Sequence, residues 1–155
     1  MKATGIVRRV DELGRLVIPK EIRRTMRLAE GTPLEIFTDR EGQIILKKYS
    51  PMMELGSFAK QYAESVAQTM NQKVAVSDRD QIIAVAGGGK RELLGKTISR
   101  QLEEMIINRE NSIQAGLDKK TIPLISGDED SYSAQAIYPI CCEGDCIGAV
   151  ILYSR

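Results

Sequence analysis

The first fifty residues alternate short apolar runs with residues that favour turns. Gly5–Val10 and Leu16–Ile18 carry the apolar and β-branched side chains typical of short strands, and Gly14 between them can adopt positive φ. Pro19 cannot donate a hydrogen bond to a neighbouring strand, but it suits the first turn of a helix. The pattern therefore predicts two strands and then a helix of about two turns over Lys20–Leu28.

A hairpin is predicted after this helix. Leu34–Thr38 and Gln43–Tyr49 are strand-like, and Asp39–Gly42 between them is typical of a turn. The only helix of this segment lies between strands, which excludes a helix-turn-helix protein because that motif needs two consecutive helices. A segment this short buries little apolar surface, so we expect it to fold as a dimer.

Ser50-Pro51 marks the next boundary, since Ser favours the N-cap of a helix and Pro favours its first turn. A helix is predicted over 51–71, with an apolar stripe at helical spacing. Packing of this stripe against its own domain is the default interpretation, and contact with the same helix of a second chain is the alternative. The stripe consists of Leu55, Phe58, Ala59, Tyr62, Val66 and Met70.

The rest of the chain alternates strand-like and helical patterns. One amphipathic helix is predicted over 97–108, and residues 87–92 are predicted to form a flexible loop. A sheet flanked by helices, in α+β order, is the packing that buries these patterns best. The predicted strands span 73–77, 81–86, 121–125, 134–142 and 146–153.

Positive charge is concentrated near the N-terminus. The whole chain has 22 basic and 21 acidic residues. Residues 1–50, however, have 11 and 7, a net charge of +4, whereas residues 51–155 have 11 and 14, a net charge of −3. This asymmetry indicates a segment that binds a polyanion, joined to a domain with another task.

The composition argues against an enzyme active site or a metal-binding site. The chain has no histidine, which excludes Ser-His and Cys-His nucleophile pairs and zinc sites that need imidazole. Cys141, Cys142 and Cys146 are predicted to be small buried apolar side chains, with redox sensing and thiol catalysis as lesser alternatives. We expect no catalytic residue, metal or cofactor. The odd cysteine count and the absence of a long apolar run predict a cytoplasmic protein.

The predicted first helix carries a row of cations. Lys20, Arg23, Arg24 and Arg27 are spaced i, i+3, i+4 and i+7, which places them on one helical face. Like charges at this spacing repel, so an anionic partner that covers them would explain their presence. The planar guanidinium group makes paired hydrogen bonds to phosphates or to guanine, which favours DNA. Arg8, Arg9 and Arg15 extend this basic surface if the strands bring them alongside.

The N-terminal sequence resembles the AbrB family of bacterial transition-state regulators. The resemblance covers "IVRRVDELGRLVIPKEIRRTMRLAEGTPLEIFTDREGQIILKKY", which runs from Ile6 to Tyr49. It implies a swapped-hairpin β-barrel dimer, in which two chains interleave their strands to form one unit that binds double-stranded DNA. It also implies which side chains contact DNA. These are Arg8, Arg15, Arg23 and Arg24, with Lys2 and Arg9 as additions.

Beyond Tyr49, "KKYSPMMELGSFAKQYAESV" and "IGAVILYS" resemble sporulation regulators that join an AbrB-type domain to a GAF-like domain. The resemblance implies an AbrB-like domain over 1–50, a linker and first helix over 51–72, and a GAF-like α/β sandwich over 73–155. A GAF-like domain usually ends in a helix that this sequence lacks, which indicates a truncated C-terminus or a partner over that surface.

The same resemblance implies a function and an assembly. It implies a nucleoid-associated transcription factor that activates some sporulation genes and represses others. It also implies a homotetramer, made of two swapped-hairpin dimers that are joined through the GAF-like domains, which could bind an unknown small molecule. An antitoxin-like module, with an AbrB-type DNA-binding domain and a tail that neutralises a partner protein, is the alternative function.

Overall fold

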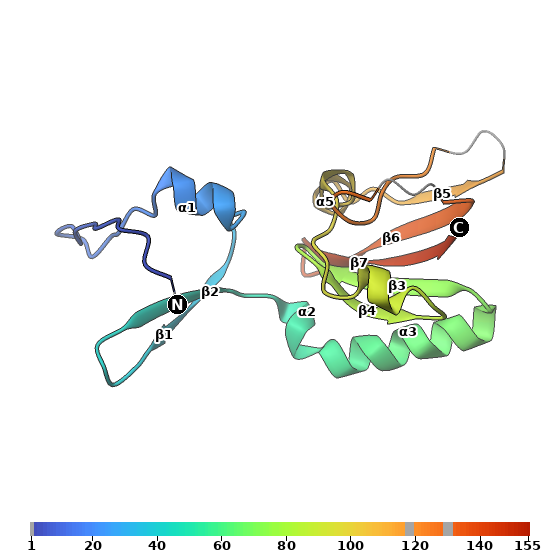
Figure 1. Cartoon of the computed structure of the whole chain (residues 1–155), viewed down its shortest axis with the longest axis horizontal. Helices are drawn as coiled ribbons and strands as arrows, with labels where there is room; N and C mark the ends of the chain where they lie inside the picture. The colour runs from blue at the N-terminus through green and yellow to red at the C-terminus, as the bar shows by residue number, and fades with distance from the viewer. Residues whose placement is uncertain (1, 117–119, 129–131) are drawn as a thin grey trace. The chain divides into compact units, whose positions relative to one another are not determined.

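The computed structural model describes residues 2–116, 120–128 and 132–155, apart from the side chain of residue 53. The chain divides into two compact units, Met1–Tyr49 and Ser50–Arg155. The elements of both units are labelled in Figure 1.

The first unit contains one short helix and one hairpin, α1 (Lys20–Thr25), β1 (Leu34–Thr38) and β2 (Ile44–Lys48). The two strands pair antiparallel, as the sequence predicts. The turn between them is held by Asp39, whose backbone N–H donates to the Gln43 carbonyl over 3.2 Å. The Asp39 carboxylate also accepts hydrogen bonds from backbone N–H groups of the turn, at 2.8 and 2.9 Å. Local side-chain bonds of this kind explain why the hairpin is predictable.

The two strands predicted before α1 are not formed, and this prediction is wrong for the single chain. Gly5–Val10 and Leu16–Ile18 are irregular in structure and belong to neither sheet among the described residues. An extended segment becomes a strand only when a neighbour takes up its backbone hydrogen bonds. Within the described part of one chain, no such neighbour lies beside them.

Helix α1 is also shorter than predicted, since it ends at Thr25 instead of Leu28. The Leu28 N–H donates to the Arg23 carbonyl over 2.8 Å, and the Arg27 N–H donates to the Arg24 carbonyl over 3.3 Å. Arg27 itself adopts the left-handed conformation, with φ of 56°. These two bonds and this φ form a Schellman motif, which ends a helix by satisfying its last carbonyl groups.

The second unit is built on a five-stranded antiparallel sheet with the strand order β4-β3-β7-β6-β5. Helix α3 lies on one side of this sheet and helix α5 on the other (Figure 1). The α+β class predicted from the sequence is therefore confirmed. The strands are β3 (Lys73–Asp78), β4 (Ile82–Ala86), β5 (Ser112–Ala115), β6 (Ala134–Cys142) and β7 (Asp145–Ser154). The helices are α2 (Pro51–Glu54), α3 (Gly56–Met70), α4 (Lys90–Leu93) and α5 (Arg100–Ile107).

The predicted helix over 51–71 is interrupted, and of the predicted apolar stripe only Ala59 is buried and Val66 half-buried. The chain leaves helical geometry at Leu55, which separates α2 from α3. The buried residues of α3 are Ala59, Ala63 and Ala67. Small alanine side chains let the helix approach the sheet closely, so the bulky apolar residues remain on the outer side. Phe58 is 63% exposed there, and Leu55, Tyr62 and Met70 are also exposed.

The strand predicted over 121–125 is wrong as well, because only Ile125 forms a β-bridge, with Ile98, and the residues before it are irregular. The Gln135 side chain donates to the Ile122 carbonyl over 2.8 Å and accepts from the Ile122 N–H over 3.0 Å. The Ser99 hydroxyl, which caps the N-terminus of α5, donates to the Pro123 carbonyl over 2.6 Å. Two side chains therefore take up backbone groups of Ile122 and Pro123 that a strand neighbour would otherwise use.

The cysteines correct a further prediction, since only Cys146 is buried. Strands β6 and β7 place Cys141 directly opposite Cys146, and the two form a disulfide. Cys142, the next residue along β6, is exposed and free. The hairpin turn at Glu143 and Gly144 has positive φ at both positions, which matches the tight turns that suit antiparallel strands. Cross-strand register, which the spacing of the cysteines does not reveal, decides this pairing.

This pairing predicts the pattern of thiol labelling. In folded protein purified without reductant, iodoacetamide should modify Cys142 alone, because the other two thiols are joined to each other. After reduction and denaturation, all three cysteines should react, as measured by mass spectrometry of the intact chain. Cys142→Ser is the matched control and should take up no label before reduction. Three labels without reductant would show that the disulfide is absent.

Candidate nucleic-acid interface

The basic N-terminal segment is organised by a turn around Asp11. Its carboxylate accepts hydrogen bonds from the backbone N–H groups of Leu13 and Arg15 at 2.9 and 2.8 Å, and from the Arg15 guanidinium at 2.8 Å. Gly14 supplies the positive φ that the turn requires. The backbone hydrogen bond from Arg15, followed by the one from its side chain, lowers the pKa of Asp11. Sequence analysis missed this role of Asp11, although an Asp that opens a turn containing Gly is its usual signal.

The turn reverses the chain, so that its basic residues lie on two arms. Arg8 and Arg9 precede the turn, and Arg15 ends it. All of the predicted DNA-contacting side chains are exposed: Lys2, Arg8, Arg9, Arg15, Arg23 and Arg24. Among these, and counting only ion pairs within the described residues, Arg15 alone is paired with a carboxylate. The remaining cations are open to an external anion.

Helix α1 carries a smaller cationic row than the sequence indicates. Lys20, Arg23 and Arg24 lie within the helix and are exposed. Arg27 lies beyond the helix end and is only half-exposed, so the predicted four-residue face is wrong in its last member. Arg23 and Arg24 lie in the last turn, where positive charge also interacts favourably with the helix dipole. The segment nevertheless keeps an excess of cations, which suits a polyanionic ligand.

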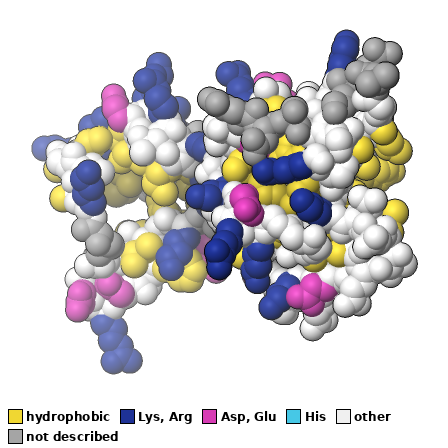
Figure 2. Space-filling model, turned by 45° about the vertical axis from the view of Figure 1, so that its right-hand side comes forward, with side chains coloured by type: hydrophobic (Ala, Val, Ile, Leu, Met, Phe, Trp, Pro, Cys, Tyr) yellow, Lys and Arg dark blue, Asp and Glu magenta, His cyan; other side chains and the backbone are white. Residues whose placement is uncertain are grey.

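Many apolar side chains of this unit are exposed to solvent, as its cations are. Pro19 is its only buried residue among those the structure describes. Val7 is 84% exposed and Val17 69% exposed, and both lie on the arms. Apolar side chains reach the surface beside Lys and Arg, as Figure 2 shows from one side. Large exposed apolar areas mark surfaces that another chain covers.

Among the described residues, no arrangement of side chains points to catalysis. No three His, Cys, Asp or Glu side chains gather around a possible metal position in the described ranges. Tyr132 is fully buried and donates to the Asp128 carboxylate over 2.5 Å. Burial, and then the neighbouring carboxylate, raise the pKa of this phenol, which therefore remains protonated. Searching the described helices for one long and apolar enough to span a bilayer gives none.

Two protein families match this chain, and their matches meet between residues 53 and 54. Residues 7–53 match the family described as antidote-toxin recognition MazE, bacterial antitoxin. Residues 54–155 match the family described as stage V sporulation protein T C-terminal, transcription factor.

Individual relatives match either the whole chain or its N-terminal part. Stage V sporulation protein T of Bacillus subtilis (strain 168) is 50% identical over 155 residues, which cover all of this chain and 86% of that protein. The transition state regulatory protein AbrB of the same organism is 66% identical over 53 residues, or 34% of this chain and 54% of that protein. The solution structure of the N-domain of the transcription factor AbrB is 67% identical and covers 33% of this chain and 96% of that one, with a TM-score of 0.30.

The breadth of these matches decides the family. One family covers more than half of the chain, and a relative that shares half of its residues spans all of it. The resemblance to AbrB-type sporulation regulators, read first from the sequence, is thus confirmed. This chain belongs to the family of stage V sporulation protein T, a family of transcription factors.

Proposed function

We propose that this protein is a sequence-specific DNA-binding regulator that activates some sporulation genes and represses others. The observation that carries the proposal is the set of exposed cations on the two N-terminal arms and α1. The names of its relatives, a transition state regulatory protein and a sporulation protein, support the same role. A protein that acts on chromosomal DNA works in the cytoplasm, on the nucleoid.

The geometry of α1 favours contacts with the DNA backbone. A helix of 6 residues is about 9 Å long, which reaches only a small part of the major groove. Arg23 and Arg24 on α1, with Arg8 and Arg15 on the arms, therefore bind phosphates and a few base edges. In such an interface phosphate contacts set the position, and DNA shape contributes to specificity.

The N-terminal unit works as an interleaved dimer in this proposal. A unit of 49 residues with a single buried side chain has too little core to fold alone. A second copy would cover the exposed valines of the arms and supply strand neighbours for segments 5–10 and 16–18. This arrangement is the swapped hairpin implied by the AbrB resemblance, and it presents the cations of both chains to one DNA duplex.

The second unit acts as a GAF-like domain that joins two such dimers into a tetramer. The outer side of α3 supports this, because Phe58 and Tyr62 stack there with ring centroids 6.5 Å apart while exposed to solvent. An exposed apolar helix face is a common contact between subunits. A polar hollow of about 380 Å³ between α5 and β5, lined in part by Gln101, Asn108 and Gln114, provides space for a small-molecule signal.

An antitoxin-like function is the second candidate. The match of residues 7–53 to a bacterial antitoxin family favours it. In that function the second unit would neutralise a toxin instead of joining DNA-binding dimers. Purification of the chain from its host with a single stoichiometric toxin would support this candidate over the regulator.

Removal of two cations should weaken DNA binding strongly without unfolding the protein. The double variant Arg23→Ala, Arg24→Ala should bind at least about 30-fold more weakly, because each specific arginine contact contributes roughly 1–3 kcal/mol and about 1.4 kcal/mol corresponds to a tenfold change in affinity. Its affinity should also depend less steeply on salt. The measurement is fluorescence anisotropy with a duplex that the unmodified protein has selected from a random-sequence pool. Arg40→Ala, which removes an exposed arginine at the β1–β2 turn, is the control, and full binding by the double variant would contradict the proposal.

Charge placed on an arm should break the interleaved dimer. Val17→Glu changes a side chain that is 69% exposed in one chain, so it should be harmless unless a second copy covers it. We expect the mass in solution to fall from tetramer to dimer, as measured by sedimentation velocity. Arg40→Glu also adds negative charge in the first unit and should leave the mass unchanged. A tetramer that persists in Val17→Glu would rule out this mode of assembly.

A further inference from the structure

The end of the β6–β7 hairpin is closed by a disulfide. The register between the two strands shifts just after Ile140. Beyond this shift two residue pairs remain, Cys141 with Cys146 and Cys142 with Asp145. The disulfide joins the first pair, whose members are five positions apart in the sequence. Because a register shift weakens the local ladder of hydrogen bonds, this covalent bond restrains the least regular part of the hairpin.

The disulfide contributes little to the stability of the fold. A disulfide stabilises a protein mainly by restricting its unfolded chain, and so short a loop gives little restriction. The second unit also has a buried core on each side of its sheet. We therefore expect the unit to stay folded whether the two sulfur atoms are joined or separate, as a reversible reaction at this position requires.

The two sulfur atoms of the disulfide differ in their access to solvent. Cys141 is exposed, whereas Cys146 is only 7% exposed and belongs to the core on the α5 side. A thiolate from outside needs an accessible sulfur, so its attack takes place at Cys141. Cys142 is exposed too, but adjacent residues of a strand point to opposite faces, so its own thiol is poorly placed to attack.

One hydrogen bond connects the hairpin to the end of α5. The Arg109 guanidinium donates to the carbonyl of Gly144, in the turn between the two strands. Arg109 follows α5 with φ of 57°, and its N–H donates to the Ile106 carbonyl over 3.2 Å. Its sequence neighbours Asn108 and Glu110 line the polar hollow between α5 and β5. The hairpin turn is thus linked through a single side chain to the wall of this hollow.

From this arrangement we infer that the end of the hairpin is a site of thiol–disulfide exchange with low-molecular-weight thiols, and that Arg109 transmits its redox state to the hollow. The inference rests on the proposed function in one respect, because a regulator in the cytoplasm meets a pool of reduced thiols in which lasting disulfides are rare. When the disulfide opens, the turn loses its covalent restraint, and the hydrogen bond from Arg109 to Gly144 weakens.

The exchange consumes two molecules of the small thiol. The thiolate of the first molecule attacks the sulfur of Cys141, so that a new S–S bond forms and the bond to Cys146 breaks. Cys146 leaves as a thiolate and takes up a proton. The thiolate of the second molecule attacks the sulfur of the first, which releases Cys141 as a thiolate that also takes up a proton. The two small thiols are oxidised to one disulfide, and the two electrons they lose reduce the disulfide of the protein.

Reduced and oxidised glutathione are the probes of this exchange, and the full chain with Cys142→Ser leaves only the paired cysteines to react. Excess reduced glutathione should open the disulfide in the folded protein, and oxidised glutathione should close it again. Trapping with iodoacetamide, followed by mass spectrometry of the intact chain, should find two labels in the first case and none in the second. A disulfide that opens only after denaturant is added, or a chain that loses its circular dichroism spectrum on reduction, would overturn the inference.

Hydrogen exchange tests whether Arg109 transmits the redox state. On reduction, the amides of residues 141–146 and 108–110 should exchange about two- to ten-fold faster, as the loss of one hydrogen bond allows. Arg109→Ala should keep the first change and abolish the second. Arg91→Ala, which removes another exposed arginine of the second unit, is the matched control and should respond like the unmodified protein. Cys141→Ser should exchange like the reduced protein without any reagent.

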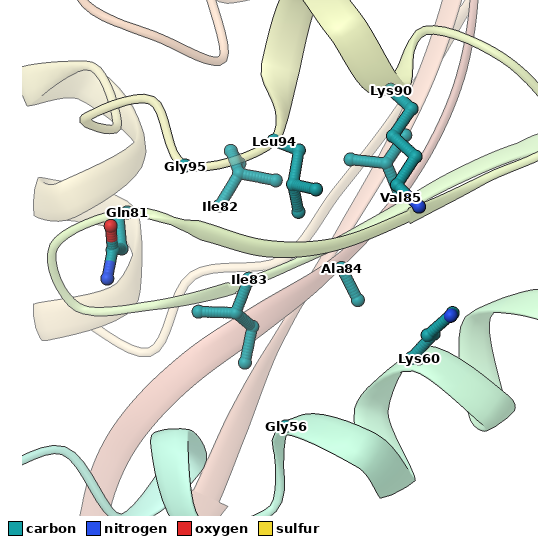
Figure 3. Close-up of a pocket in the computed structure, with 10 residues that line it drawn as sticks. All are labelled: Gly56, Lys60, Gln81, Ile82, Ile83, Ala84, Val85, Lys90, Leu94 and Gly95. Atoms are coloured by element: carbon teal, nitrogen blue, oxygen red, sulfur yellow. The ribbon is translucent and has the colours of Figure 1, made fainter.

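A second hollow, of about 350 Å³ beside β4, provides an internal reference. Figure 3 shows Ile83 and Ala84 of β4 among the residues that line it. Strands β3 and β7 separate β4 from β6, so the amides of residues 82–85 should exchange equally in both redox states. A change there would mean that the whole sheet loosens, and it would overturn transmission through Arg109. Equal exchange of residues 108–110 in both redox states, or a redox effect that persists in Arg109→Ala, would do the same. DNA takes no part in these measurements, so their outcome is independent of the proposed regulator.

Discussion

The first 49 residues cannot bury their own apolar side chains, and this constraint governs how the protein works. Pro19 is the one buried residue among those described in the unit, while Val7 and Val17 remain open. Burial of a valine or leucine side chain stabilises a protein by about 1.5–3 kcal/mol, so in the proposed dimer a second copy that covers several of them would provide much of the missing stability. Dimerisation and the placing of arginines for DNA would then be one event.

The second unit meets the opposite condition, since it has a buried core on each side of its sheet. Ile137, Ile151 and Tyr153 pack on the α5 side, and Val74 and Val76 pack on the α3 side. Large apolar residues remain exposed on the outer side of α3, and also at Ile113 of β5 and Tyr138 of β6. A unit with a core of its own suits the proposed role of joining preformed dimers, because its fold does not depend on the contact it makes.

Sequence patterns predicted the elements whose causes are local. The hairpin β1–β2 follows from alternation and from Asp39 in its turn, and β6 and β7 follow from long apolar runs around a tight Glu143-Gly144 turn. The failures have distant causes. Gly5–Val10 needs a strand neighbour that one chain does not provide, and the disulfide depends on the register between β6 and β7. For the interface, residue type predicted the exposed arginines, whereas the left-handed φ of Arg27 removed one of them from the helical face.

The shortness of α1 explains why the proposed assembly needs both units. In the proposed complex, the six residues of α1 would contact few base edges, so one dimer would gain most of its affinity from phosphates and would discriminate weakly between sequences. When two dimers are joined, binding of the first raises the effective concentration of the second at a neighbouring site. Specificity then comes from the pairing and spacing of sites on DNA, and the surface that joins the dimers becomes part of sequence recognition. A signal or partner protein that acts on the second unit could thus change promoter choice without touching an arginine.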